Sequence, residues 1–238
     1  GTFIRSIHAL APYFKEMAEA SVRCSRSPGE LFSELRPIGQ RAETAMLKAT
    51  GGINTHKGQI FSLGLAVGAG CSLKRRGELS SELLSQSIAH MAQGMSEREL
   101  KCKIESTTHG EKMYDAYGVT GIRGEAEKGF PAAFKVGLPV YEEALNSGID
   151  DNSALIKTIV SIMAVLEDSN VYRRGGSYSA EWVKKTASCL MANGMSLNKI
   201  PLSQIREFDE EMIRRNLSPG GAADMLALTV FVHNFIGS

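Results

Sequence analysis

The run SALIKTIVSIMAVL, residues 153–166, decides the fold class of this 238-residue chain. Its apolar side chains fall on nearly every face of a helix, which is typical of a helix buried at the centre of a bundle. Asp150, Asp151 and Asn152 come directly before the run and can cap such a helix. We therefore predict a central helix over residues 153–166, with the other helices packed around it.

Helical spacing of apolar residues continues on both sides of this run, and we find no convincing strand alternation or hairpin signal. Aromatic residues make up only 7% of the chain, which also favours helices over sheets. No composition shift or internal repeat marks a boundary. We predict one all-α domain over residues 1–238, a multi-helix bundle of about nine to twelve helices.

Composition excludes several classes of protein. Lys and Arg number 27 against 26 Asp and Glu, a balance that argues against a nucleic-acid binder. No apolar run reaches the roughly 20 residues of a membrane span, and no signal peptide is visible. The four Cys form no CxxC pair. We therefore expect a cytoplasmic protein with reduced thiols, bound neither to nucleic acid nor to a membrane.

The stretch TTHGEKMYDAYGVTGIRGEAEKGFP, residues 107–131, concentrates the ionisable side chains. A helix over residues 105–117 would place Glu111 and Asp115 on one face. Glycines then break the helix, and Glu125 and Glu127 follow at the next helix start. Carboxylates from both elements can converge to hold Mg²⁺ or to transfer protons. A solvated helix face followed by a loop explains the same pattern.

Three predicted helix starts share one composition: NTHKG at 54–58, RRGGS at 173–177 and SPGG at 218–221. Free backbone N–H groups and the helix dipole make such starts anion sites, and Gly allows a phosphate to approach closely. Three of them indicate a ligand with several phosphates, although His56 could equally be a core or cap histidine. None matches a P-loop or a Rossmann fingerprint.

Asp168 follows the predicted central helix. A carboxylate at the C-terminal end of a helix faces the negative end of the dipole. A bound cation would compensate for that repulsion, so we consider Asp168 a candidate metal ligand.

Together these blocks resemble the triphosphoribosyl-dephospho-CoA synthase family, the ATP:dephospho-CoA triphosphoribosyltransferases of citrate lyase and malonate decarboxylase systems. The resembling blocks are FIRSIHALAPYF, GGINTHKGQIFSLG, THGE, RGEAEKGFP, DSNVYRRGG and NLSPGGAADMLALT. Two positions depart from the family pattern, with Ser169 in its D-T-N block and Ala222 in its SPGGSAD block. The family usually begins with a further KPGLV-containing segment, and we expect that this chain lacks it.

The resemblance implies an all-α fold and a transfer reaction. The 2′-hydroxyl of dephospho-CoA attacks the anomeric carbon of the ATP ribose, adenine leaves, and the triphosphoribosyl group is transferred. The product is the prosthetic-group precursor of an acyl-carrier protein. That carrier, or a nucleotidyltransferase of the same pathway, is therefore an expected partner, and Mg²⁺ is the expected cofactor.

The resemblance also implies roles for individual residues. Glu111 would be the general base or a metal ligand, and His109 would assist adenine departure. Glu125 would act with them, and Glu127 and Asp168 would bind metal or ribose. The groups implied for phosphate and nucleotide binding are Asn54, His56, Lys57, Arg123, Arg174, Gly175, Gly176, Ser218, Gly220 and Gly221.

Two rival functions use the same residues. One is an all-α, Mg²⁺-dependent hydrolase of a nucleotide or an ADP-ribose-like ligand. The other is a non-catalytic nucleotide-binding homologue.

Overall fold

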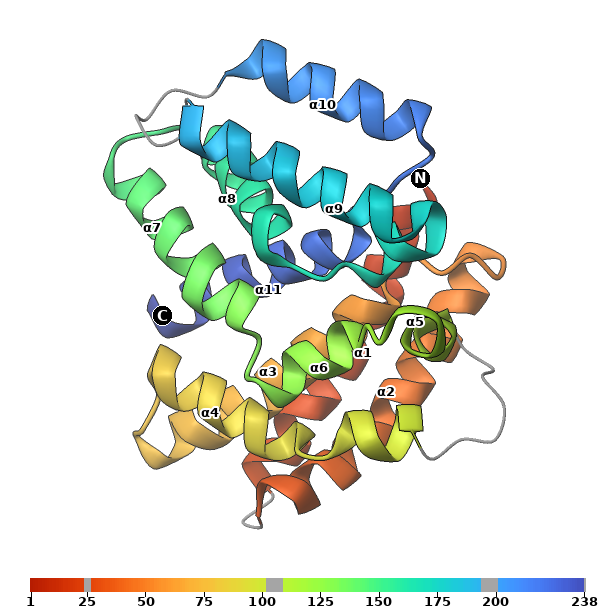
Figure 1. Cartoon of the computed structure of the whole chain (residues 1–238). Helices are drawn as coiled ribbons and strands as arrows, with labels where there is room; N and C mark the ends of the chain where they lie inside the picture. Colours follow the sequence, from red (N-terminus) through yellow and green to blue (C-terminus); the bar gives the residue numbers. More distant parts are fainter. Residues whose placement is uncertain (24–26, 102–108, 194–200, 238) are drawn as a thin grey trace. The chain divides into compact units, whose positions relative to one another are not determined.

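The computed structural model describes residues 1–23, 27–101, 109–193 and 201–237, without the side chains of residues 100, 101, 109–111 and 193. Over these ranges the chain forms eleven α-helices and two π-helical segments, and no strand (Figure 1). The predicted all-α class is therefore confirmed. Within the same ranges, no helix combines the length and the apolar character that crossing a bilayer would need.

The chain divides into two compact units. Unit 1 comprises residues 1–93, 126–130 and the end of the chain from Phe235. Unit 2 comprises residues 94–125 and 131–234. That the whole chain acts as one catalytic domain stays a prediction.

Unit 1 is built mainly from the first four helices, of which α1 packs on α2 and α3, and α4 packs on α2 and α3 (Figure 1). They are α1 (Thr2–Arg23), α2 (Pro28–Thr50), α3 (Lys57–Arg76) and α4 (Ser81–Ala92). Leu10, Met46 and Ile60 join α1, α2 and α3 in one buried cluster. Helices α1 and α2 each continue through a proline, Pro12 and Pro37.

Glycines let neighbouring side chains approach α3 closely. A Cβ atom on Gly68 would lie 2.3 Å from Cδ1 of Leu35, and one on Gly70 would lie 2.6 Å from Cε1 of Phe235. Contacts this short leave no room for a methyl group. The glycines of α3 therefore allow Leu35 and Phe235 to pack directly against its backbone.

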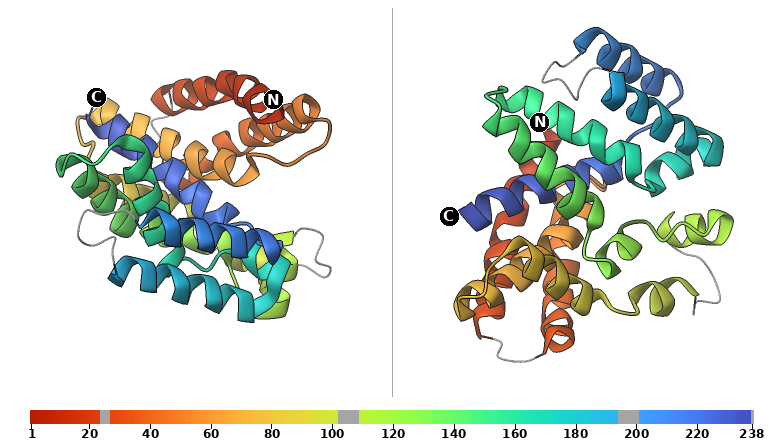
Figure 2. Two further views of the ribbon diagram at one scale, coloured as in Figure 1. Left: turned by 90° about the horizontal axis from the view of Figure 1, so that it is seen from above. Right: turned by 60° about the vertical axis from the view of Figure 1, so that its left-hand side comes forward.

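In unit 2, helix α8 packs against α7, α9 and the second π-helical segment. Helix α10 lies along α9 (Figure 2). Its elements are η1 (Glu97–Lys101), α5 (His109–Tyr117), η2 (Ala132–Gly137), α7 (Leu138–Asn146), α8 (Asp151–Val165), α9 (Ser169–Asn193) and α10 (Leu202–Arg214). Helices α6 (Gly121–Glu127) and α11 (Gly220–Gly237) contribute residues to both units.

Helix α8 confirms the predicted helix, and its packing against α7, α9 and η2 makes it central to unit 2, while a central place in a bundle of the whole chain stays a prediction. Asp150 accepts a hydrogen bond from the Ser153 amide at 3.1 Å and so caps it. Val160 and Ile162 are buried along it, as the apolar pattern predicts. Lys157 is also buried, and its Nζ lies 3.6 Å from a carboxylate oxygen of Glu143, an internal charge that the apolar pattern does not reveal.

Candidate functional site

The first candidate lies in unit 1, where α3 begins at Lys57 as the NTHKG block predicts. Asn54 Oδ1 accepts a hydrogen bond from the Lys57 amide at 3.0 Å, and Lys57 Nζ lies 3.0 Å from Glu43 Oε2. The Lys57 and Glu43 side chains are 53% and 32% exposed. Ion pairs this exposed stabilise a protein by about 1 kcal/mol or less. Lys57 can therefore exchange Glu43 for a phosphate at little cost.

His56 immediately precedes α3, and its residue surface is only 3% exposed. Its Nδ1 lies 2.5 Å from Ser6 Oγ and 2.9 Å from Thr55 Oγ1. Its Nε2 is buried and has no hydrogen-bond partner within the described residues. Burial lowers the pKa of His56 below its usual range, so the imidazole is neutral near pH 7. The ring therefore lacks the positive charge that favours phosphate binding.

The second candidate lies in unit 2, around Asp168. Helix α8 ends at Val165 and α9 begins at Ser169, so Asp168 stands at the start of α9. Its Oδ1 accepts the Asn170 amide at 2.9 Å. The prediction that Asp168 faces the negative end of a dipole is wrong, because the residues after it continue as a helix. A carboxylate here is favoured by the positive end of the dipole.

The same carboxylate also binds the start of α11. Its Oδ2 accepts the Ala222 amide at 3.0 Å, across 54 residues of sequence. Asp168 is 6% exposed. Burial raises the pKa of its carboxyl group, and the hydrogen bonds from the Ala222 and Asn170 amides act in the opposite direction. One side chain therefore satisfies backbone groups at two helix starts.

The two glycines of the SPGG block accommodate these side chains. A Cβ atom on Gly221 would lie 3.0 Å from the Asp168 carboxylate, and one on Gly220 would lie 2.8 Å from Asn170 Nδ2. The protein's own carboxylate thus lies where the sequence predicts a phosphate. Ser218 precedes the first residue of α11 by two positions.

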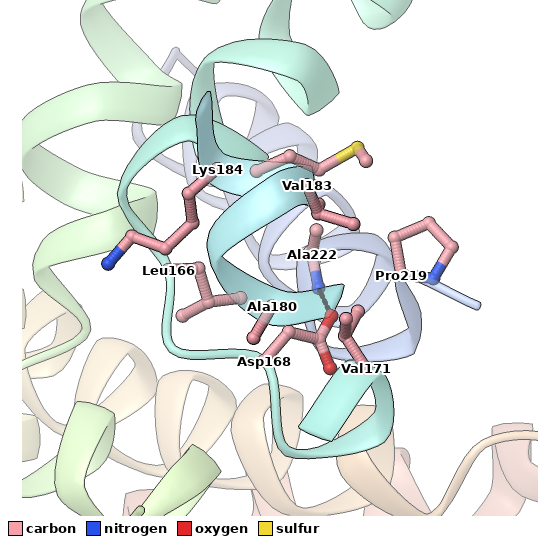
Figure 3. Close-up of a pocket in the computed structure, with 9 residues that line it drawn as sticks. Leu166, Asp168, Val171, Ala180, Val183, Lys184, Pro219 and Ala222 are labelled. Carbon is pink, nitrogen blue, oxygen red and sulfur yellow. Dashed lines mark hydrogen bonds between the residues drawn. The ribbon is translucent and has the colours of Figure 1, made fainter. Parts of the chain in front are cut away.

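A small pocket lies beside Asp168 (Figure 3). It is lined by Met163, Leu166, Asp168, Val171, Ala180, Val183, Lys184, Pro219 and Ala222. Its volume of about 10 Å³ is close to the space that one water molecule requires. A nucleotide is far larger, so this pocket is not a substrate site.

Arg174 lies inside α9, where the sequence predicts a helix start. Gly176 has φ 69° and ψ −172°, which interrupts the helical backbone directly after the two arginines and Gly175. Arg174 Nη1 donates hydrogen bonds to the Asn216 carbonyl oxygen at 3.2 Å and to its Oδ1 at 3.0 Å. Within the described residues Arg174 is thus hydrogen-bonded to a neutral side chain and not to a carboxylate, which suits contact with an anion.

The carboxylate stretch forms helices α5 and α6 with the predicted glycine break at Gly118 between them, while residues 105–108 of the predicted first helix lie outside the described residues. Helix α6 already begins at Gly121, so the prediction that Glu125 and Glu127 follow at a helix start is wrong: they lie at its end. The side chains of His109 and Glu111 lie outside the described part of the structure. Arg123 Nε donates to Glu99 Oε2 at 2.9 Å, and Glu125 Oε2 accepts the Ala132 amide at 3.1 Å.

The predicted convergence of the four carboxylates is untested, since Glu127 belongs to unit 1 and Glu125 to unit 2. Among the described residues, no three His, Cys, Asp or Glu side chains lie together as metal ligands would.

Unit 2 contains an aromatic and acidic cluster that the sequence does not predict. Tyr172 donates a hydrogen bond to Glu167 at 2.5 Å, and Lys184 forms an ion pair with the same carboxylate. The Tyr117 ring lies 5.4 Å from the Tyr172 ring between centroids. Burial, followed by the bond to Glu167, raises the pKa of Tyr172 to about 12. These residues come from separate parts of the sequence, so no local pattern predicts the cluster. The one available signal is the DSNVYRRGG block, which contains Tyr172.

Comparison with known proteins identifies the family of the chain. The model of the family described as CitG: ATP:dephospho-CoA triphosphoribosyl transferase matches residues 1–237. A crystal structure of an Archaeoglobus fulgidus protein, assigned as a triphosphoribosyl-dephospho-CoA synthase, superposes with a TM-score of 0.58. The superposition covers 98% of this chain and 99% of that one at 16% identity. At that identity the likeness shows the fold, and the family match carries the assignment. The chain belongs to the ATP:dephospho-CoA triphosphoribosyl transferase family.

Proposed function

We propose that this chain transfers the 5-triphosphoribosyl group of ATP to the 2′-hydroxyl of dephospho-CoA and releases adenine. The observation that carries the proposal is the family match over residues 1–237. The product would be the prosthetic-group precursor of a citrate lyase or malonate decarboxylase acyl-carrier protein. Interaction with that carrier or with a nucleotidyltransferase, and a cytoplasmic location, stay predictions.

Each unit offers one candidate cation for phosphate binding, Lys57 at the start of α3 in unit 1 and Arg174 before the kink of α9 in unit 2. Lys57 is held by an exposed ion pair, and Arg174 by a neutral asparagine, so both can bind an anion at little cost. Arg123 is less available, because the side chains of its ion pair with Glu99 are only 22% and 19% exposed. Breaking a buried pair leaves an uncompensated charge. We therefore assign phosphate binding first to Lys57 and Arg174.

The proton-transfer roles implied for Glu111, His109 and Glu125 stay predictions. The bond from the Ala132 amide to Glu125 shows that this carboxylate also stabilises the start of η2. Its replacement would therefore affect structure as well as chemistry.

Asp168 is not suited to bind the proposed Mg²⁺. Both carboxylate oxygens of this residue accept backbone N–H groups, and the side chain is almost completely buried. A ligand to Mg²⁺ needs an accessible oxygen lone pair. We therefore assign Asp168 to the helix starts and derive no step through the metal from this residue.

A mass-spectrometric assay of the purified chain with ATP, dephospho-CoA and Mg²⁺ tests the proposal. Free adenine should appear together with a dephospho-CoA adduct heavier by one triphosphoribosyl group. Glu111→Gln should abolish both products and leave the helical circular dichroism spectrum unchanged. Inorganic phosphate or free ribose phosphate would instead indicate the hydrolase, and binding without turnover would indicate the non-catalytic homologue.

A further inference from the structure

The hydroxyl groups around His56 determine which ring nitrogen carries the proton. Ser6 Oγ lies 3.1 Å from the Phe3 carbonyl oxygen, and Thr55 Oγ1 lies 3.0 Å from Ser6 Oγ. Both hydroxyls also contact His56 Nδ1. The Phe3 carbonyl can only accept, so the proton of Ser6 is directed to it, and the proton of Thr55 is directed to Ser6.

His56 Nδ1 must then provide the remaining proton. With hydrogen on Nδ1, all four contacts in this group are hydrogen bonds, with the Nδ1 proton shared between Ser6 and Thr55. With hydrogen on Nε2, the two hydroxyls have only two protons for the same four contacts. The Nδ1–H form therefore satisfies the network best, and it leaves Nε2 with a free lone pair.

That lone pair is buried, and no donor among the described residues reaches it. Leaving a buried polar group unsatisfied costs about 1–3 kcal/mol, so such a group in a native protein calls for an explanation, of which a catalytic role is one. A lone pair repels phosphate oxygen but accepts a hydrogen bond from a hydroxyl group. An imidazole held through Nδ1, with Nε2 ready to accept a proton, is also the arrangement of a histidine general base.

We propose that His56 Nε2 is the acceptor for a ligand hydroxyl group, and that in the transfer reaction it takes the proton of the attacking 2′-hydroxyl of dephospho-CoA. This inference rests on the proposed function. The O–H bond of the hydroxyl breaks and an N–H bond forms at Nε2. The oxygen bonds to the anomeric carbon while the carbon–nitrogen bond to adenine breaks. Adenine leaves with that electron pair and receives the proton that Nε2 has taken.

Phe3 covers the imidazole. Its ring centroid lies 4.1 Å from that of His56, and the residue is 53% exposed in the first turn of α1. Among the described residues, the side chains hydrogen-bonded to the His56 ring are the hydroxyl groups of Ser6, which is buried, and Thr55, while Met46 Sδ accepts the His56 backbone amide. A ligand would therefore reach Nε2 most easily by displacing Phe3.

Nitrogen-15 NMR of the intact chain with labelled histidine tests the acceptor directly. Without ligand, Nδ1 should show the shift of a protonated ring nitrogen and Nε2 that of an unprotonated one. Dephospho-CoA should move the Nε2 resonance, and its 2′-deoxy analogue should not. A protonated Nε2, an unchanged resonance, or the same change with both ligands would overturn the proposal.

Kinetics of His56→Asn provide the second test. The asparagine amide can still donate to Ser6 and Thr55 but has no atom at the position of Nε2. We expect kcat to fall about 100-fold or more, with KM for dephospho-CoA little changed. His90→Asn, at an exposed position on α4, is the matched control and should retain full activity.

The outcomes separate the two proposals. Full activity in a folded His56→Asn variant would overturn the role of His56 and leave the transferase intact. If the wild-type chain releases no adenine, the transferase proposal fails, and the NMR response alone decides whether Nε2 binds a hydroxyl. The NMR test also decides the matter if His56→Asn does not fold.

Discussion

Asp224 is a partly buried carboxylate in a helix otherwise rich in apolar residues. It lies one turn into α11, near Asp168. Burial, followed by the repulsion from Asp168, raises its pKa from 3.8 to about 7. The folded chain therefore holds this proton more tightly than the unfolded chain does. The free energy of unfolding should fall as pH rises from about 4 to 7, because Asp224 ionises more easily in the unfolded chain than in the folded one.

Asp224→Asn removes this cost. We expect the variant to be more stable than wild type at pH 8, by at most about 4 kcal/mol, since one pKa unit corresponds to about 1.4 kcal/mol. The advantage should vanish near pH 4. Urea unfolding at both pH values measures it. Asp209→Asn, at an exposed position on α10, is the control, and an equal pH dependence in wild type and Asp224→Asn would contradict the assignment.

At the scale of single elements, hydroxyl caps determine several helix starts. Ser80 is in an extended conformation before α4, and its Oγ accepts the Leu83 amide at 3.2 Å. Ser80→Ala should lower the free energy of unfolding by about 1 kcal/mol. Ser81→Ala, one residue later inside the helix, is the control because Ser81 is not the cap. Equal stability of the two variants in urea would show that the cap contributes nothing.

The sequence identifies most helices because their periodicity is local, but it locates capping boxes poorly. Ser96 to Glu99 has the S-x-x-E pattern of a capping box, yet η1 begins at Glu97 and Glu99 forms an ion pair with Arg123. Ser27 and Glu30 have the same spacing, and they make the reciprocal bonds of a capping box. The pattern permits either outcome. The distant partner of Glu99 decides between them, and no local rule contains it.

In the candidate sites, too, the sequence predicts features that depend on adjacent residues and misses those that depend on distant ones. The start of α3 at Lys57 depends on neighbouring residues alone, so the NTHKG block predicts it. The role of Asp168 depends on Ala222, far along the chain, so local charge arguments misplace it. The network around His56 likewise needs Ser6 from α1. Long-range contacts thus determine which predicted anion sites remain open to a ligand.

At the scale of the whole molecule, nearly equal numbers of basic and acidic residues leave a net charge of +1. Binding of two polyanionic substrates must therefore depend on local groups. Dephospho-CoA at 100 times its dissociation constant should raise the free energy of unfolding by about 2.7 kcal/mol, because it binds only the folded chain. Calorimetry gives the constant and thermal unfolding gives the shift. Sodium sulfate at equal ionic strength is the control, and an equal shift with sulfate would indicate a general salt effect.

The carboxylate shared by the starts of α9 and α11 also constrains how this protein can change over generations. A side chain at position 221 would crowd the Asp168 carboxylate, since a Cβ atom there would lie 3.0 Å from it, so Gly221 and Asp168 suit each other. A replacement at either position alone would leave a steric overlap or an unfilled space with unbonded amides. Positions 168 and 221 should therefore be inherited as a pair, so that relatives differ at both or at neither.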